Sequence, residues 1–148
     1  MKYQGSIVIN QPRARVVEAF MDVEAMKKYQ DGFQKKELLS GNQGENGAKS
    51  RMYYQHGKME MILDETITAN NLPETFEAFY HHKHMDNTMK CTFVEVDDGQ
   101  TRYEYEFEYT RMNWVMPRLI AIFFPSVYRK QAEKWMKQFK ELLESKEG

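Results

Sequence analysis

The sequence predicts an α+β protein in which one strand and two short helices precede six further strands and a long C-terminal helix. Residues 101–109, TRYEYEFEY, alternate aromatic and charged side chains with the period of two that is typical of a half-buried strand. Turn residues at short intervals before this segment indicate consecutive antiparallel strands. After it, apolar residues recur every three or four positions as far as Leu143, which predicts a helix.

The first third of the chain predicts a strand followed by two helices. Residues 6–10, SIVIN, form the expected strand, and Pro12 ends it because proline favours the first turn of a helix. From residue 13 onward, apolar side chains recur at helical spacing. Asp22 is a suitable cap for a second short helix in this run, and the QDG turn at 30–32 ends it.

The middle of the chain contains strand-like segments separated by glycine, asparagine, aspartate and proline. We expect strands at residues 33–41, 48–56, 58–69, 74–84, 88–96 and 101–111. We expect the final helix to be capped by Asn113. Pro125 lacks an N–H and clashes with the preceding turn, which predicts a kink or a break within this helix.

The composition is that of a globular protein without a nucleic-acid partner. The 148 residues are 41% apolar and 29% charged, and the net charge of -1 lacks the basic surplus that phosphate binding needs. Cys91 is the single cysteine, so no internal disulfide forms, and the N-terminus lacks the apolar core of a signal peptide. The longest apolar run, 119–124, is too short to cross a bilayer. We therefore expect a cytoplasmic protein without stable membrane insertion.

The order of elements resembles the START/polyketide cyclase-like (SRPBCC, helix-grip) superfamily over essentially the whole chain. The resemblance is most specific near the N-terminus, in Ile7, Ile9, Pro12, Val16, Val17, Phe20, Asp22, Tyr29 and the segments FQKKELLSGN and GENGAKSRMYY. Tyr29 departs from the pattern, since many members have tryptophan there. The resemblance implies a single domain, residues 1–148, with a curved antiparallel sheet of about seven strands wrapped around the C-terminal helix and an apolar cavity between them.

Strand parity predicts which side chains face the helix. The expected walls of the cavity are Met61, Leu63, Phe76, Tyr80, Met89, Phe93, Tyr103, Tyr105, Phe107, Ile120, Phe124 and Tyr128. Tyr105, His82 and Tyr54 are the expected polar anchors for a ligand. A packed core rarely buries so many polar tips, because each one needs a partner, whereas ligand pockets combine apolar walls with a few polar groups. The alternative is that the tyrosines belong to an ordinary core and reach water with their hydroxyls.

Three functions fit these features. The first is binding or transport of a small hydrophobic molecule, such as a lipid or an aromatic polyketide-like compound. The second is an enzyme of the polyketide cyclase or dehydratase type, with His82 or Glu65 as general base. The third is a protein-interaction module like the co-chaperone members of the superfamily, with a filled core and an exposed apolar patch. His82 and His84 lack a local third ligand, so we expect no metal, and no cofactor motif is present.

Overall fold

Seven antiparallel strands form one sheet in the computed structural model, which describes residues 2–112 and 118–145 and, for 118–128, the backbone alone. The order across the sheet is β1-β7-β6-β5-β4-β3-β2. The strands are β1 (Lys2–Ile9), β2 (Phe33–Ser40), β3 (Lys49–His56), β4 (Met59–Asn71), β5 (Thr75–His82), β6 (Met85–Asp97) and β7 (Gln100–Met112). Apart from β1, each strand pairs with the next strand in the chain, as short turns between antiparallel strands require.

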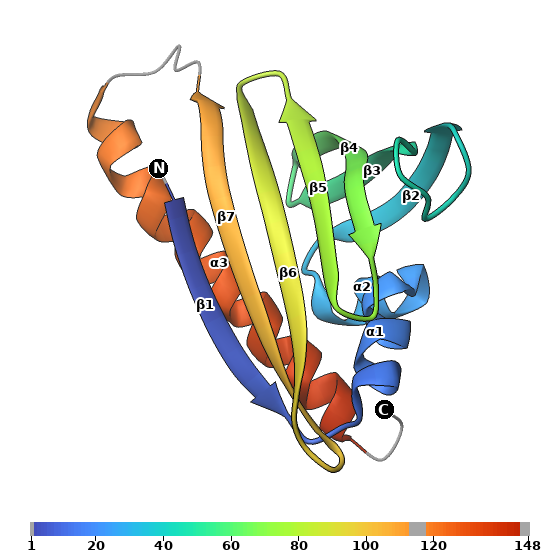
Figure 1. Ribbon diagram of the computed structural model, residues 1–148. Helices are drawn as coiled ribbons and strands as arrows, with labels where there is room; N and C mark the ends of the chain where they lie inside the picture. Colours follow the sequence, from blue (N-terminus) through green and yellow to red (C-terminus); the bar gives the residue numbers. More distant parts are fainter. Residues whose placement is uncertain (1, 113–117, 146–148) are drawn as a thin grey trace.

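Three helices complete the architecture of the residues that the structure describes. Helices α1 (Arg13–Met21) and α2 (Val23–Tyr29) connect β1 to β2, and α3 (Arg118–Glu144) follows β7. Figure 1 shows α3 running along one face of the curved sheet, with α1 and α2 grouped at one end of it. The predicted α+β helix-grip arrangement is therefore confirmed.

Local sequence signals account for the helices. The Asp22 carboxylate accepts a hydrogen bond of 2.9 Å from the Glu24 backbone N–H, so it caps α2 as predicted. On α3, buried side chains recur at helical spacing in Ala132, Met136, Phe139 and Leu143. The ring of Phe139 lies 4.8 Å from that of Tyr29, which joins α3 to α2 in the core.

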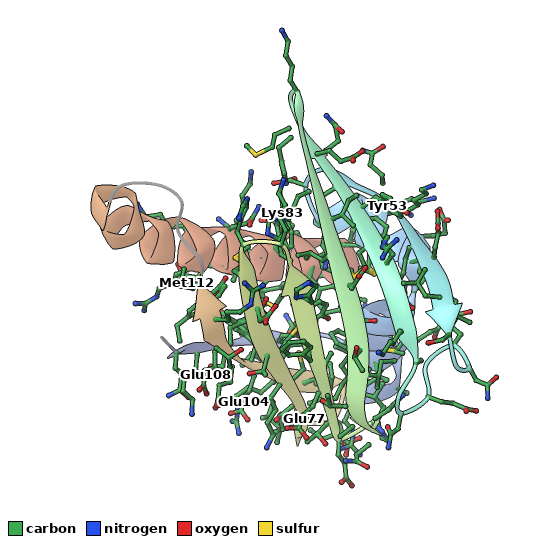
Figure 2. All side chains as sticks on the ribbon, turned by 90° about the horizontal axis from the view of Figure 1, so that it is seen from above. Tyr53, Glu77, Lys83, Glu104, Glu108 and Met112 are labelled. Carbon is green, nitrogen blue, oxygen red and sulfur yellow. The ribbon has the colours of Figure 1, made fainter. Side chains whose placement is uncertain are left out.

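The alternation in β7 separates a core face from a water face, as predicted. Tyr103 and Tyr105 are only 2% and 7% exposed, and both face α3. Figure 2 shows Glu104 and Glu108 on the other side of the sheet, away from α3. Burying one face of a strand fixes its register, because a slip of one residue would turn the glutamates into the core.

Some element boundaries differ from the predictions. Strand β1 begins at Lys2, because its first residues pair with β7 up to Glu108. The hairpin between β5 and β6 turns at residues 83–84 rather than at 85–87, and Met85 already pairs with Met112. Helix α3 continues through Pro125, so the helix is not broken at this residue. The expected cap, Asn113, lies outside the described residues.

Candidate functional site

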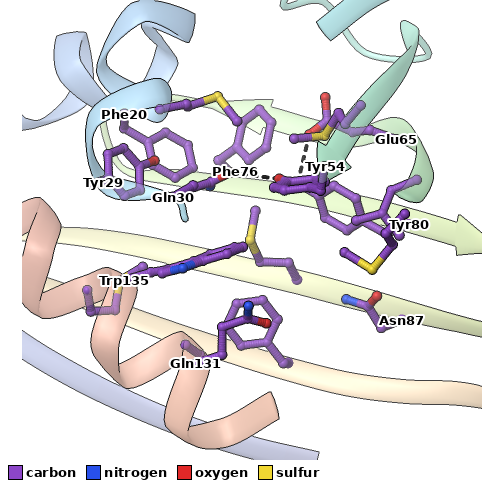
Figure 3. Close-up of a pocket in the computed structure, with 18 of the residues that line it drawn as sticks. Phe20, Tyr29, Gln30, Tyr54, Glu65, Phe76, Tyr80, Asn87, Gln131 and Trp135 are labelled. Carbon is purple, nitrogen blue, oxygen red and sulfur yellow. Dashed lines mark hydrogen bonds between the residues drawn. The ribbon is translucent and has the colours of Figure 1, made fainter. Parts of the chain in front are cut away.

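A cavity of about 170 Å³ lies between the sheet and α3. Its walls come from strands β1 to β7 on one side and from α1, α2 and α3 on the other. Figure 3 shows Trp135 and Gln131 projecting from α3 toward the strand residues Tyr54 and Tyr80. The lining is mainly methionine and aromatic. Among the residues whose side chains are described, seven methionines take part, namely Met21, Met26, Met52, Met61, Met85, Met89 and Met136.

The structure brings eight of the residues predicted from strand parity to this cavity. They are Tyr54, Met61, Leu63, Phe76, Tyr80, Met89, Tyr103 and Phe107. Their side chains gather there because β3 to β7 all turn the same face toward α3. Ile120, Phe124 and Tyr128, which were also predicted as walls, lie outside the residues whose side chains are described.

His82 does not line the cavity, although it was expected to anchor a ligand. Strand β5 ends at this residue, and its half-buried ring lies 5.6 Å from the ring of His84 in the hairpin turn. Burial and then the neighbouring His84 lower the pKa of His82 below its ordinary value, so the ring is neutral near pH 7. Within the described part of the chain, no three His, Cys, Asp or Glu side chains gather as metal ligands would.

Tyr105 and Phe93 are buried beside the cavity rather than in its wall. The Tyr105 ring lies across Gly5 on β1, where a side chain on residue 5 would collide with it. The absence of a Cβ on Gly5 therefore leaves space for the Tyr105 ring against β1. Phe93 packs at 5.1 Å from Phe20 of α1, in the fully buried core.

Glu65 is a carboxylate buried in the cavity wall, only 4% exposed. The Tyr80 hydroxyl donates a 2.7 Å hydrogen bond to Glu65 Oε2 (Figure 3). Lys36 Nζ lies 2.8 Å from Glu65 Oε1 and forms an ion pair that is not well aligned as a hydrogen bond. Burial, followed by the charge of Glu65, holds the pKa of Tyr80 well above its ordinary value. The Tyr80 hydroxyl therefore stays protonated and acts as the hydrogen-bond donor to Glu65.

Two further aromatic residues connect α3 to β3 at the cavity. The rings of Trp135 and Tyr54 stack with centroids 5.9 Å apart and planes 11° apart. The Tyr54 hydroxyl donates a 2.7 Å hydrogen bond to Gln30 Oε1, so this buried polar group is satisfied inside the protein. Trp135 Nε1 is buried and has no hydrogen-bond partner among the described residues.

Tyr103 belongs to both the cavity and the core. Its hydroxyl lies 3.2 Å from Cys91 Sγ, in a hydrogen bond in which either group is able to donate. Burial raises the pKa of Cys91 to about 12, so the thiol is protonated and is a poor nucleophile at neutral pH. The arrangement therefore gives Cys91 a packing role rather than a chemical one.

Lys36 lines the cavity although no pattern in the sequence indicated it. Strand β2 has charged or polar residues at 34–37 without alternation, and its register shifts twice, so its inner face could not be identified. In the structure Lys36 pairs with Met52, whereas Glu65 pairs with Ser50. Both charges thus lie on strands that flank β3 and face the same cavity.

Comparisons with known proteins identify the fold. In sequence comparisons, no protein-family model and no curated protein matches the chain. Among solved structures, the chain is similar to the Zhui aromatase/cyclase from Streptomyces sp. R1128, with a TM-score of 0.81, 10% identity, and coverage of 97% of this chain and 93% of that one. A START superfamily protein from Mycobacterium smegmatis matches with a TM-score of 0.78, 8% identity and 97% coverage of both chains. The structure of Ara h 8.0201 matches with a TM-score of 0.74, 14% identity and 97% coverage of both. The chain therefore has the START/polyketide cyclase-like, helix-grip fold.

Proposed function

We propose that this protein is a single domain that binds a small hydrophobic molecule in the cavity between the sheet and α3. The observation that carries the proposal is a cavity of about 170 Å³ lined mainly by methionine and aromatic side chains. Protein interiors are normally packed to the density of organic crystals, so a void of this size is costly unless something fills it. A water molecule occupies about 30 Å³ of liquid, and the cavity is therefore too large for one or two waters.

The character of the walls supports a hydrophobic ligand rather than a strongly polar one. Methionine side chains are flexible and polarizable, and they adapt to ligands of irregular shape. The polar groups of the lining include Glu65, Lys36 and the hydrogen-bonded hydroxyls of Tyr54 and Tyr80. They are fewer than the apolar groups, as in pockets where a small number of polar contacts orient a ligand.

Charge, cysteine content and helix composition bear on nucleic acid, cellular compartment and membrane. A net charge of -1 supports action on small molecules rather than on nucleic acid, and one buried cysteine fits a reducing compartment such as the cytoplasm. No helix in the described part of the chain is long and apolar enough to span a membrane.

The proposal is tested by measuring binding in a variant with a filled cavity. Ala132 is 8% exposed and lines the cavity from α3, so Ala132→Leu places three additional carbon atoms there. Lys137→Leu introduces the same side chain on the exposed side of the same helix. Native mass spectrometry with lipids and aromatic metabolites identifies a ligand, and calorimetry then compares affinities. We expect Ala132→Leu to weaken binding at least about tenfold and Lys137→Leu to leave it unchanged. No binding by the wild type, or equal binding by both variants, would contradict the proposal.

Chemistry on the bound molecule is a second candidate function, and the burial of Glu65 on the cavity wall favours it. In a cyclase or dehydratase reaction, Glu65 would accept a proton and Tyr80 would donate a hydrogen bond to a carbonyl oxygen. His82 is poorly placed for this role because it lies outside the lining. Both oxygens of Glu65 already contact Tyr80 or Lys36, so binding is the function that the geometry supports best. Loss of turnover in Glu65→Gln with ligand binding retained would establish the enzymatic function.

A protein-interaction role receives less support. It requires a filled core beside a large exposed apolar patch, whereas the cavity leaves the core incompletely filled. Leu38 and Leu39 are each 47% exposed on the edge strand β2, but two leucines fall short of the large contiguous patch that marks an interaction surface. Binding of a small molecule therefore explains more of the structure.

A further inference from the structure

The polar corner of the cavity, defined as Lys36, Glu65 and Tyr80, carries opposite charges in mainly apolar surroundings. Glu65 is 4% exposed, and the side chain of Lys36 is 20% exposed. Neighbouring wall positions on β3 and β4 are apolar, including Met52, Met61 and Leu63. A buried ion pair stabilises a fold weakly, because desolvation of the two charges offsets their attraction. The location of the pair on a cavity wall therefore points to a role in recognition.

The polar corner retains unused hydrogen-bonding capacity. An ionised carboxylate accepts at about four lone-pair positions, and Glu65 receives one directed hydrogen bond, from Tyr80. The ammonium of Lys36 has three N–H donors, and its contact with Glu65 uses at most one of them. The Tyr80 oxygen also accepts hydrogen bonds. A ligand group that both donates and accepts would contact the Glu65 carboxylate and the Lys36 ammonium together.

We propose that the ligand is a neutral hydrophobic molecule with a hydroxyl group, such as a phenol or an alcohol, and that Glu65 determines this preference. The hydroxyl donates to the Glu65 carboxylate and accepts from Lys36. An alkyl analogue leaves these groups without a hydrogen-bond partner from the ligand. An anionic ligand is repelled by Glu65, which cancels the attraction of Lys36. This inference rests on the proposed binding function and adds the class of ligand.

Three probes of nearly equal shape test the inference by calorimetry or ligand-observed NMR. They are 4-ethylphenol, 4-ethyltoluene and 4-ethylbenzoate, which place a hydroxyl, a methyl and a carboxylate on the same ring. Hydrogen bonds to charged groups are stronger than those between neutral groups, so we expect the wild type to prefer 4-ethylphenol over 4-ethyltoluene by about tenfold or more. 4-Ethylbenzoate should bind the wild type more weakly than 4-ethylphenol.

Substitution of Glu65 assigns the preference to this residue. In Glu65→Gln, the preference for the phenol should fall to about threefold or less, because the new acceptor is neutral. 4-Ethylbenzoate should then bind more tightly than to the wild type, because Lys36 has lost its counter-charge. Asp64→Asn is the matched control: Asp64 lies on the opposite face of β4 in an ion pair with Arg51, and all three affinities should be unchanged.

Lys36→Met provides a second test that does not depend on the folding of Glu65→Gln. It keeps the carboxylate, so the phenol preference should persist while 4-ethylbenzoate binds less tightly than to the wild type. Equal binding of 4-ethylphenol and 4-ethyltoluene by the wild type, or tightest binding of 4-ethylbenzoate, would overturn the inference and leave the cavity-binding function intact. If none of the three probes binds, the binding function itself fails and the inference fails with it.

Discussion

Replacing Tyr80 with phenylalanine removes the only directed hydrogen bond that Glu65 receives among the described residues. The hydroxyl lies 2.7 Å from Glu65 Oε2, and the carboxylate is 4% exposed, so water does not readily replace the lost donor. Hydrogen bonds to buried charged groups contribute about 1.5–3 kcal/mol. We therefore expect Tyr80→Phe to lower the free energy of unfolding by about 2 kcal/mol.

Urea denaturation followed by circular dichroism measures this change. With a denaturant dependence of about 2 kcal/mol per molar urea, a loss of about 2 kcal/mol lowers the unfolding midpoint by about 1 M. Tyr53→Phe is the matched control, because the Tyr53 hydroxyl contacts Glu37 at 3.5 Å in an exposed position on the outer face. Its midpoint should change by less than about 0.25 M, equivalent to about 0.5 kcal/mol.

A double-mutant cycle assigns the loss to the Tyr80–Glu65 contact. In the Glu65→Gln background, Tyr80→Phe should cost less than about 1 kcal/mol, because the hydrogen bond is then between neutral groups. Equal effects of Tyr80→Phe and Tyr53→Phe, or the same cost in both backgrounds, would refute the description of Glu65 as a buried, hydrogen-bonded carboxylate.

Three further predictions test the core, the acid sensitivity and the thiol. Phe139→Ala should lower the free energy of unfolding by about 3–5 kcal/mol because its ring is 1% exposed, whereas Lys137→Ala on the same helix should change it by less than about 0.5 kcal/mol in urea denaturation. The hydrogen-bonded Arg111 lowers the pKa of Asp86 below its ordinary value of 3.8. The contribution of this ion pair to the free energy of unfolding is therefore complete above pH 3.8 and is lost as the pH falls through the folded-state pKa. The stability difference between wild type and Arg111→Gln should therefore be constant near neutral pH and shrink below about pH 4 in acid titrations, and a constant difference down to pH 2 would contradict this. Cys91, buried with a pKa of about 12, should resist a thiol reagent at pH 8 until urea unfolds the protein, and rapid labelling of the native state would contradict its burial.

Most of the fold follows from local patterns in the sequence. The alternation at 101–109 predicts a strand with one buried face, and the structure confirms it. The spacing of Ala132, Phe139 and Leu143 predicts a helix with one buried face, which is also confirmed. The β5–β6 hairpin was misplaced because residues 85–87 contain typical turn residues. In the structure Asp86 instead pairs with Arg111 across the sheet, and the turn uses Lys83 and His84, which carry no strong turn signal.

The candidate site was less predictable because it depends on contacts between distant strands. Lys36 reaches Glu65 from a strand without alternation, so no local pattern indicated its direction. Tyr105 has the same parity as Tyr103, yet it lies over Gly5 outside the cavity, and only the pairing of β1 with β7 reveals this. Parity thus predicts the face of a strand, whereas the position of a cavity along that face depends on tertiary packing.

The methionines allow the most direct test of the central claim, which is that a hydrophobic molecule occupies the cavity. Seven of the methionines that the structure describes line it, whereas Met59 is 67% exposed in the β3–β4 hairpin and serves as an internal control. In a sample labelled with ¹³C at the methionine methyl groups, we expect 4-ethylphenol to shift the signals of Met52, Met61, Met89 and Met136 in a saturable manner and to leave Met59 unchanged. Unchanged cavity signals at saturating probe, or shifts of Met59 as large as theirs, would contradict the account.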